Sequence, residues 1–259
     1  ARNKEFGDKI RSLFLPEEGK QWGSFDYSQQ EPRLVAHYAA SVNANFSGAD
    51  EFIKSYQNEE ADFHQLVADM AGISRTQAKT INLGLFYGMG KNKLSKELGI
   101  NKDEAEALLI KYNDRVPFVK KLANEVTNSA SKYGFIRTIK GRRCRFDMWE
   151  PSTFGMNKAM HYEEAKAIYG NNIRRAFTYK ALNRLIQGSA ADQAKQAMID
   201  CYKAGFQPLL QIHDELCFSI NEEKDIKQVK ELMENAIENL KVPFSVDVAM
   251  GKSWGEAKE

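Results

Sequence analysis

Acidic residues at two distant places in the sequence have the type and setting of ligands for divalent cations. Asp26 stands where an apolar segment passes into a helical pattern, and Asp214 lies beside Glu215 inside another apolar segment. Carboxylates held a few ångströms apart repel one another, and a bound divalent cation removes that cost. Oxygen ligands suit Mg²⁺, and two such ions about 3.5–4 Å apart clamp the attacking and leaving oxygens of a phosphoryl transfer. If one sheet brings the two aspartates together, they predict this chemistry.

Each acidic segment also has a simpler interpretation. Asp26 has the setting of a turn residue, and Ser28 with Glu31 has the spacing of a helix capping box. Burial of Asp214 and Glu215 in mid-strand without partners would cost several kcal/mol. Residues 213–215 are therefore either the tip of a hairpin or a cation-binding segment.

A second group of residues has the spacing of one helix face. Its members, four positions apart, are Arg75, Lys79, Leu83 and Tyr87. Two cations followed by an apolar and an aromatic residue can hold phosphates at one end and a base at the other. The alternative is a solvated basic end that grades into a buried end. Gly84, Gly88 and Gly90 each cost a helix about 1 kcal/mol, which indicates close approach by another backbone or a ligand.

Two amide side chains, Asn183 and Gln187, lie one helical turn apart. Amides can donate to the acceptors that every base pair presents in the minor groove, so such contacts test pair shape rather than sequence. A polar helix face is the alternative. A basic cluster precedes them and is either a phosphate-binding surface or a solvated hairpin; it consists of Lys140, Arg142, Arg143 and Arg145.

The elements that must position these residues are strands near both ends of the sequence and helices between them. The economical arrangement is one sheet built from both ends, with a helical insertion. Asn101 with Glu104 predicts a capping box, and Gly134 predicts a helix end. The expected strands are 13–15, 22–25, a pair within 209–220, and 244–250; a hairpin is expected at 135–146, and helices within 28–38, 51–133, 157–204 and 222–240.

The composition is that of an ordinary globular protein. Of 259 residues, 42% are hydrophobic and 28% are charged, with a net charge of +2 that points to no partner. No segment approaches the roughly 20 apolar residues of a membrane span, so we expect no membrane association. The three cysteines predict neither a disulfide framework nor a zinc site and fit a reducing cytosol. The chain lacks an initiating Met, which indicates processing or a piece of a longer protein.

At these positions the sequence resembles the family A DNA polymerases, the group of bacterial DNA polymerase I and many phage replicative polymerases. The segment Asp26-Tyr27-Ser28-Gln29-x-Glu31-x-Arg33 resembles motif A, and His213-Asp214-Glu215 resembles motif C. The segment Arg75-x-x-x-Lys79-x-x-x-x-Gly84-x-x-Tyr87-Gly88 resembles motif B, on the O helix of the fingers. Three further segments fit in the right order: Asp62-Phe63-His64, Asn183-x-x-x-Gln187-Gly188 and Gly251-x-x-Trp254.

The resemblance implies an α+β fold of right-hand polymerase architecture, with an antiparallel palm sheet and a helical fingers insertion. It assigns residues 1–39 and 169–259 to the palm and 40–168 to the fingers, with the motif B helix at about 74–88. We expect the thumb and an exonuclease region to be absent, which would make the chain a fragment of weak activity alone.

The resemblance also implies roles for single residues. Asp26 and Asp214 would ligate two Mg²⁺ ions, or Mn²⁺ as a substitute, with help from the Tyr27 carbonyl. His213 and Glu215 would support the primer end, and Lys79 would also protonate the leaving group. Residues implied to contact the nucleotide are Arg75, Lys79, His64, Tyr87, Leu83, Glu31 and Gln29; those implied to contact DNA are Arg33, Asn183, Gln187, His213 and Tyr179.

Some positions depart from the family pattern. Leu83 replaces the usual Phe or Tyr, Thr76 replaces the second of a usual Arg pair, Tyr179 replaces a frequent Arg, and Pro32 replaces an apolar helix former. Leu83 and the compact fingers loop look more phage-like than bacterial.

The predicted function is addition of dNTPs to a primer 3′-OH with release of pyrophosphate, on primer-template DNA, in the cytoplasm of a bacterial or phage-infected cell. A single-subunit RNA polymerase is the nearest alternative, and Glu31 argues against it. A non-catalytic nucleic-acid-binding subunit of the same fold is the other.

Overall fold

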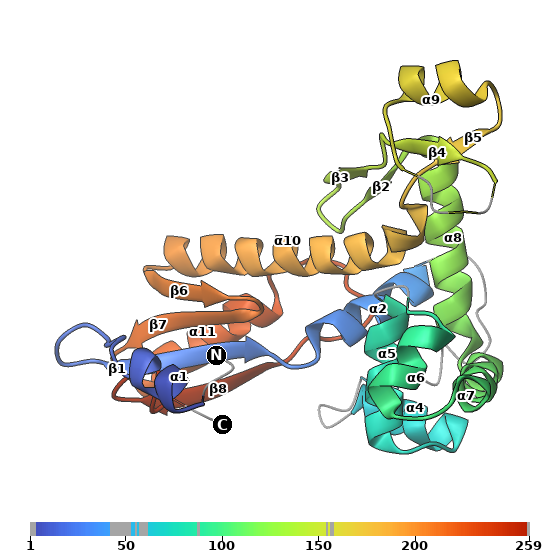
Figure 1. Ribbon diagram of the computed structural model, residues 1–259. Coiled ribbons are helices and arrows are strands. Elements are labelled where there is room, and N and C mark those ends of the chain that lie inside the picture. The colour runs from blue at the N-terminus through green and yellow to red at the C-terminus, as the bar shows by residue number, and fades with distance from the viewer. Residues whose placement is uncertain are drawn as a thin grey trace. The chain divides into compact units, whose positions relative to one another are not determined.

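The computed structural model describes residues 4–41, 53–54, 56, 62–86, 89–153, 155 and 158–257. The chain forms two compact units (Figure 1). We call Ala1–Arg33 with Ala190–Glu259 the sheet unit, and Leu34–Ser189 the helical unit. The boundaries fall inside helices α2 (Gln30–Ser41) and α10 (Ala181–Lys203). The palm and fingers boundaries expected at 39/40 and 168/169 stay a prediction.

The sheet unit contains a four-stranded antiparallel sheet in the order β6-β7-β1-β8 (Figure 1). Strand β1 (Gln21–Tyr27) lies between β7 (Glu215–Ile220) and β8 (Val246–Gly251), and β6 (Pro208–Ile212) forms one edge. Strands from opposite ends of the sequence therefore pair directly. This confirms the expected single sheet built from both ends of the chain.

One face of the sheet is apolar. Phe25, Tyr27 and Phe218 alternate onto it and are buried, and the Phe25 and Phe218 rings meet edge to face at 5.7 Å. Helix α11 (Glu223–Glu234) packs on β7 and β8, and the Tyr27 hydroxyl donates to the Met233 carbonyl at 2.6 Å. Because side chains alternate along a strand, the neighbours of these residues point to the other face.

The other face carries a smaller apolar cluster around Trp22 and Cys217, which includes Trp254 from the C-terminal segment. The N-terminal segment joins it after α1 (Lys4–Arg11): the Phe14 ring meets Trp254 edge to face at 5.6 Å, and the Phe14 carbonyl accepts from the Trp254 amide at 3.0 Å. The expected strand at residues 13–15 is therefore wrong. Phe14 secures the C-terminal segment instead of entering the sheet, and Leu13 and Leu15 are exposed.

The helical unit begins at Leu34, within the first half of α2. Asn101 forms the predicted capping box with Glu104 at the start of α7 (Lys102–Arg115), and Gly134 ends α8 (Pro117–Tyr133) in the left-handed region, with φ 75°. The hairpin expected at 135–146 is also confirmed, as β2 (Phe135–Arg137) pairs with β3 (Arg143–Arg145). The remaining elements are α4 (Phe63–Ala71), α5 (Arg75–Phe86), α6 (Lys91–Leu98), β4 (Trp149–Pro151), α9 (Tyr162–Tyr169), β5 (Ile173–Arg175) and the 3₁₀ helix η1 (Thr178–Lys180).

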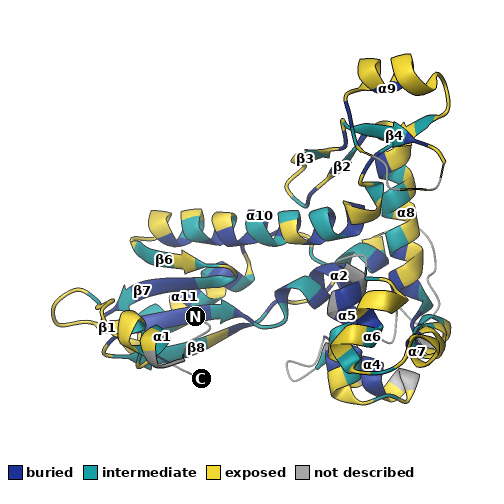
Figure 2. Ribbon diagram, in the orientation of Figure 1, coloured by how far each residue is buried: buried dark blue, intermediate teal, exposed yellow. Residues whose placement is uncertain are grey.

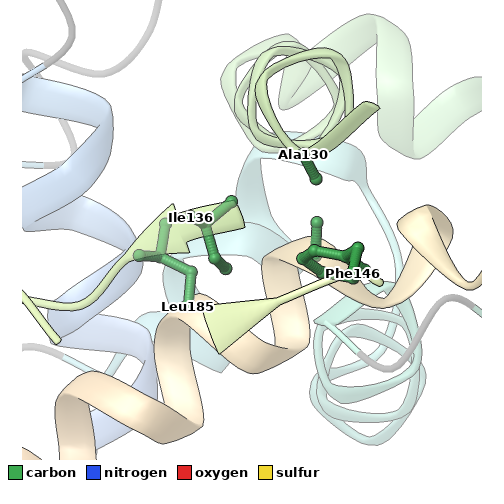
Figure 3. Packing of buried hydrophobic residues seen from close by; sticks show 5 residues of the cluster. Ala130, Ile136, Phe146 and Leu185 are labelled. Atoms are coloured by element: carbon green, nitrogen blue, oxygen red, sulfur yellow. The ribbon is translucent and has the colours of Figure 1, made fainter. Parts of the chain in front are cut away.

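A small apolar core joins α8, the β2–β3 hairpin and the start of α10. Figure 3 shows Ala130, Ile136, Phe146 and Leu185 converging, and Ala181 completes the cluster. Helix α9, by contrast, is exposed along most of its length (Figure 2). None of the helices in the described part of the chain is long and apolar enough to span a membrane.

Candidate active site

The end of β1 and the β6–β7 turn bring four of the predicted residues together. Ile212 pairs with Glu215, so His213 and Asp214 form a two-residue hairpin turn, and His213 takes the left-handed φ of 56°. Asp26, the second-to-last residue of β1, lies opposite Glu215. The Tyr27 amide donates to the Asp214 carbonyl at 3.4 Å, which places the turn beside the end of β1.

The surroundings of Asp214 disfavour its charged form. Burial raises the pKa of its carboxyl above the usual range, and the neighbouring Glu215 adds to the increase. The Asp214 backbone amide and His213 oppose it. Carboxylates crowded in this way are the ones that gain most from a bound cation.

Glu215 is held by two donors. The Trp254 indole Nε1–H donates to Glu215 Oε1 at 3.1 Å, and the Cys217 thiol donates to the same oxygen at 3.4 Å. Trp254 is in turn held by Phe14 and by the Arg11 guanidinium, 5.1 Å from the centre of its ring. The C-terminal segment therefore fixes the position of one of the predicted catalytic acids.

A further carboxylate, not identified from the sequence, lies on the same face of the sheet as Asp26 and Glu215. Asp247 of β8 pairs with Asp26, and both line a pocket of about 210 Å³ with Glu215 and Trp254. The signal in the sequence that could have identified Asp247 is its position between Val246 and Val248, since alternation of apolar and polar residues is typical of a strand. The described residues contain no group of three His, Cys, Asp or Glu side chains arranged to hold a metal ion. The pair Asp26 and Asp214 nonetheless offers oxygen donors only, which fits Mg²⁺ or Mn²⁺.

Hydrogen bonds from a buried arginine hold the turn that follows β1 against the rest of the sheet unit. Gln29 takes a left-handed φ of 53°, and Glu31 is half-buried at the start of α2. Arg33 is only 1% exposed, and its guanidinium donates to the Ser28 carbonyl at 3.0 Å, the Pro243 carbonyl at 2.6 Å and Ser245 Oγ at 3.2 Å. Arg33, which was expected to contact DNA, thus holds the backbone behind Asp26.

In the helical unit, the predicted triphosphate ligands gather around Asp62. Its carboxylate caps α4 by accepting from the His64 amide at 2.8 Å, and it also accepts from Arg75 Nε at 2.7 Å. Burial raises the pKa of Asp62, but the hydrogen bonds from Arg75 and the backbone outweigh it, so the pKa falls below its usual value. Lys79 is exposed one helical turn after Arg75 on α5.

His64 is buried beside these charges. Burial lowers the pKa of its imidazole, Asp62 opposes that shift, and Lys79 and Arg75 add to it. Leu83 lies in α5, and its side chain is outside the described part, as is the whole of Tyr87. Their expected roles stay predictions.

The predicted DNA contacts of the helical unit lie in η1 and along the first half of α10. Tyr179 and Gln187 are exposed and Asn183 is half-buried. The basic hairpin docks here, since Arg142 Nη2 donates to the Gly188 carbonyl at 2.9 Å. A Cβ on Gly188 would lie 2.8 Å from the Thr138 side chain, which explains the glycine in this segment.

The comparisons with known proteins agree over nearly the whole chain. The model of DNA polymerase family A matches residues 1–256. A DNA-directed DNA polymerase of Pseudomonas phage M6 is 36% identical over 293 residues, covering 98% of this chain and 41% of that protein. The thermostable DNA polymerase I of Thermus aquaticus is 33% identical over 269 residues, covering 98% of this chain and 29% of that protein.

A solved structure gives the same result. The POL domain of Pol1 from M. smegmatis, in complex with DNA primer-template and dNTP, matches with a TM-score of 0.76 and 32% identity, covering 99% of this chain and 44% of that one. The chain therefore spans less than half the length of these relatives. With a matching family model, relatives and fold, the chain belongs to DNA polymerase family A.

Proposed function

We propose that the chain carries the reaction centre of a DNA-directed DNA polymerase, which adds dNTPs to a primer 3′-OH and releases pyrophosphate. The observation that supports this most is the pairing of β1 with the β6–β7 hairpin, which gathers Asp26, Asp214 and Glu215 at one end of the sheet. Family A DNA polymerases in general use divalent metal ions.

The sheet unit supplies the proposed metal ligands. Asp26 and Asp214 would hold two Mg²⁺ ions, with the Tyr27 carbonyl as a further ligand and Mn²⁺ as a substitute. Bound there, the ions would lower the pKa of the primer hydroxyl and neutralise the triphosphate. Glu215, fixed by Trp254, and His213, on the hairpin turn, would position the primer end.

The helical unit supplies the proposed triphosphate ligands. Arg75 and Lys79 present two positive charges on one face of α5, and His64 lies close enough to be affected by both. Lys79 would donate a proton to the leaving pyrophosphate. Contacts to the incoming base and sugar are proposed for Leu83, Tyr87, Gln29 and Glu31.

Primer-template DNA would be bound by groups of the same unit, of which the hairpin cations, Gln187 and Tyr179 are exposed and Asn183 is half-buried. The hairpin cations would contact phosphates, while Asn183 and Gln187 on α10 would reach minor-groove acceptors, with Tyr179 nearby. A DNA contact by Arg33 would require its guanidinium to break its three partly buried hydrogen bonds.

Primer extension with Mg²⁺ tests the proposal. Asp26→Asn and Asp214→Asn each remove a ligand charge while preserving shape, and we expect extension to fall about a thousandfold or more, roughly 4 kcal/mol of transition-state stabilisation. Asp147→Asn, at an exposed aspartate of the helical unit, is the matched control and should be unaffected. Primer-template affinity should stay within about threefold in all three variants.

Several outcomes would contradict the proposal. Full extension by Asp214→Asn would remove that residue from the reaction. Equal use of rNTPs and dNTPs would favour an RNA polymerase. Binding of primer-template without any extension, both by the chain and by a fusion that supplies the expected thumb, would leave a non-catalytic nucleic-acid-binding protein.

A further inference from the structure

A chain of hydrogen bonds links α4, α5 and α7 in the interior of the helical unit. Asn82 of α5 is fully buried and lies between His64 of α4 and Tyr112 of α7. The Tyr112 hydroxyl donates to Asn82 Oδ1 at 2.5 Å, and Asn82 Nδ2 lies 3.1 Å from His64 Nδ1. Tyr112 is also fully buried, and burial raises the pKa of its hydroxyl, which therefore remains protonated.

The chemistry of these groups gives the chain of bonds a direction. An amide oxygen only accepts hydrogen bonds and an amide nitrogen only donates them. Because Tyr112 donates to Oδ1, the amide directs its NH₂ group at His64 Nδ1, which must then be unprotonated. The proton of the neutral ring consequently lies on Nε2.

The flipped amide is less favourable. In that orientation Nδ2 would face the Tyr112 oxygen, and the tyrosine would lose the acceptor of its own proton. Loss of a hydrogen bond at a buried group is costly, so the Tyr112 hydroxyl selects one orientation of Asn82.

We propose that Asn82 and Tyr112 are positioning residues that hold His64 in the Nε2–H tautomer, so that a neutral imidazole donates a hydrogen bond to an anionic oxygen. The identity of that anion as the dNTP triphosphate rests on the proposed function. The charged groups that act on His64 are Asp62 at the start of α4 and Arg75 and Lys79 on α5; α7 contributes Tyr112.

The tautomer matters because this histidine is not charged at neutral pH. Burial lowers the pKa of His64, and the two cations of α5 add to that shift against Asp62. A neutral ring donates from one nitrogen only, so a proton on Nδ1 would present a lone pair to the phosphate. The buried amide prevents this without adding another charge to the cationic cluster.

NMR spectroscopy of the chain labelled with ¹⁵N-histidine tests the proposal directly. The sequence has four histidines, and loss of one set of signals in His64→Gln assigns His64. At pH 8 we expect the long-range ¹H–¹⁵N pattern of the Nε2–H tautomer. An Nδ1–H pattern would overturn the proposal.

Asn82→Asp preserves the shape and presents acceptors only. Its carboxylate should draw the proton to Nδ1 and raise the pKa of His64 by about one unit or more. Asn171→Asp, at an exposed turn of the same unit, adds an equal charge and should leave the tautomer unchanged. An unchanged His64 tautomer in Asn82→Asp would overturn the proposal.

Tyr112→Phe provides the second variant, which keeps the amide and tests the same claim if Asn82→Asp does not fold. Without the hydroxyl, the orientation of the amide is no longer selected, so both tautomers should appear. Retention of the Nε2–H tautomer alone would show that Tyr112 has no part in the selection.

A pH profile separates positioning from structural damage. At pH 9 the KM for dTTP in Asn82→Asp should rise about tenfold, the worth of one hydrogen bond to a charged group. The increase should shrink as the pH falls through the pKa of His64, since the doubly protonated ring regains a donor at Nε2. A loss that is independent of pH would indicate structural damage and contradict the proposal.

A changed tautomer with unchanged dTTP affinity would have a different meaning. It would support the roles of Asn82 and Tyr112 and refute only the assignment of His64 to the triphosphate in the proposed function.

Discussion

Replacement of Arg33 by lysine tests how the backbone behind Asp26 is held. Lysine keeps the charge, but its single ammonium group cannot reach three acceptors in the directions that the guanidinium does. With one of the three hydrogen bonds recovered, two are lost, and each bond to a charged group contributes about 1.5–3 kcal/mol. We therefore expect Arg33→Lys to lower the free energy of unfolding by at least about 3 kcal/mol.

Urea unfolding followed by tryptophan fluorescence measures this change, since Trp22 is buried in the same unit. Arg174→Lys is the matched control: the Arg174 side chain is 56% exposed and pairs with Glu150, so the loss should be below about 1 kcal/mol. The reasoning fails if Arg33→Lys unfolds like the parent chain yet binds primer-template at least tenfold more weakly. That result would make Arg33 a DNA ligand, as the resemblance to motif A implies.

Three further predictions concern residues that support the acidic site of the sheet unit and the basic hairpin of the helical unit. Trp254→Phe removes the donor to Glu215 but keeps an aromatic ring, and should lower the free energy of unfolding by about 1 kcal/mol in urea titration. Gly188→Ala forces a methyl group against Thr138 and should cost about 1–3 kcal/mol, measured in the same way; an unchanged midpoint would mean that the hairpin moves freely. Burial and then Glu215 raise the pKa of the Cys217 thiol to about 12, so the native chain should resist its alkylation at pH 8.5. The Cys217 thiol of the unfolded chain ionises near its ordinary pKa of 9.0, before the buried thiol does. The contribution of the protonated thiol to the free energy of unfolding is therefore complete below pH 9.0 and is lost as the pH rises toward 12. Cys217→Ala should reduce this loss of stability at high pH.

Local signals in the sequence were sufficient for several elements. The capping box at Asn101 and the helix end at Gly134 depend on residues within one helical turn, so their patterns are complete in the sequence. The apolar triplet at residues 13–15 was misleading because an apolar run does not reveal its partner. Here only Phe14 of the triplet packs, and its partner is Trp254, which lies at the other end of the chain.

The two interpretations of Asp214 turned out to be compatible. The residue stands in a hairpin turn, as the simpler interpretation required, and the turn also lies beside the end of β1. A residue in a tight turn between two strands is rigidly placed, which is what a metal ligand needs. Sequence patterns alone could not decide this point, because the register of β1 against β7 depends on contacts across nearly 200 positions.

Residues that hold the site were harder to predict than residues that would act in it. Arg33 and Asn82 are polar residues within motif-like segments, and nothing in their spacing shows that both point inward. Their partners come from other elements: the segment around Pro243 for Arg33, and α7 for Asn82. Burial of a polar side chain depends on the whole fold, so sequence periodicity reports it poorly.

The position of Asp26 in the sheet has a consequence for how the site forms. Its strand neighbours Glu215 and Asp247 come from β7 and β8, both within the last 45 residues of the chain, while Asp26 itself comes from the beginning. Strands β7 and β8 lie near each other in the sequence, separated by α11, whereas β1 lies far from both. The acidic cluster therefore assembles only when the ends of the chain pair, so the repulsion among its carboxylates opposes sheet formation itself. A divalent cation that binds the paired carboxylates would consequently stabilise the folded sheet as well as the reaction centre.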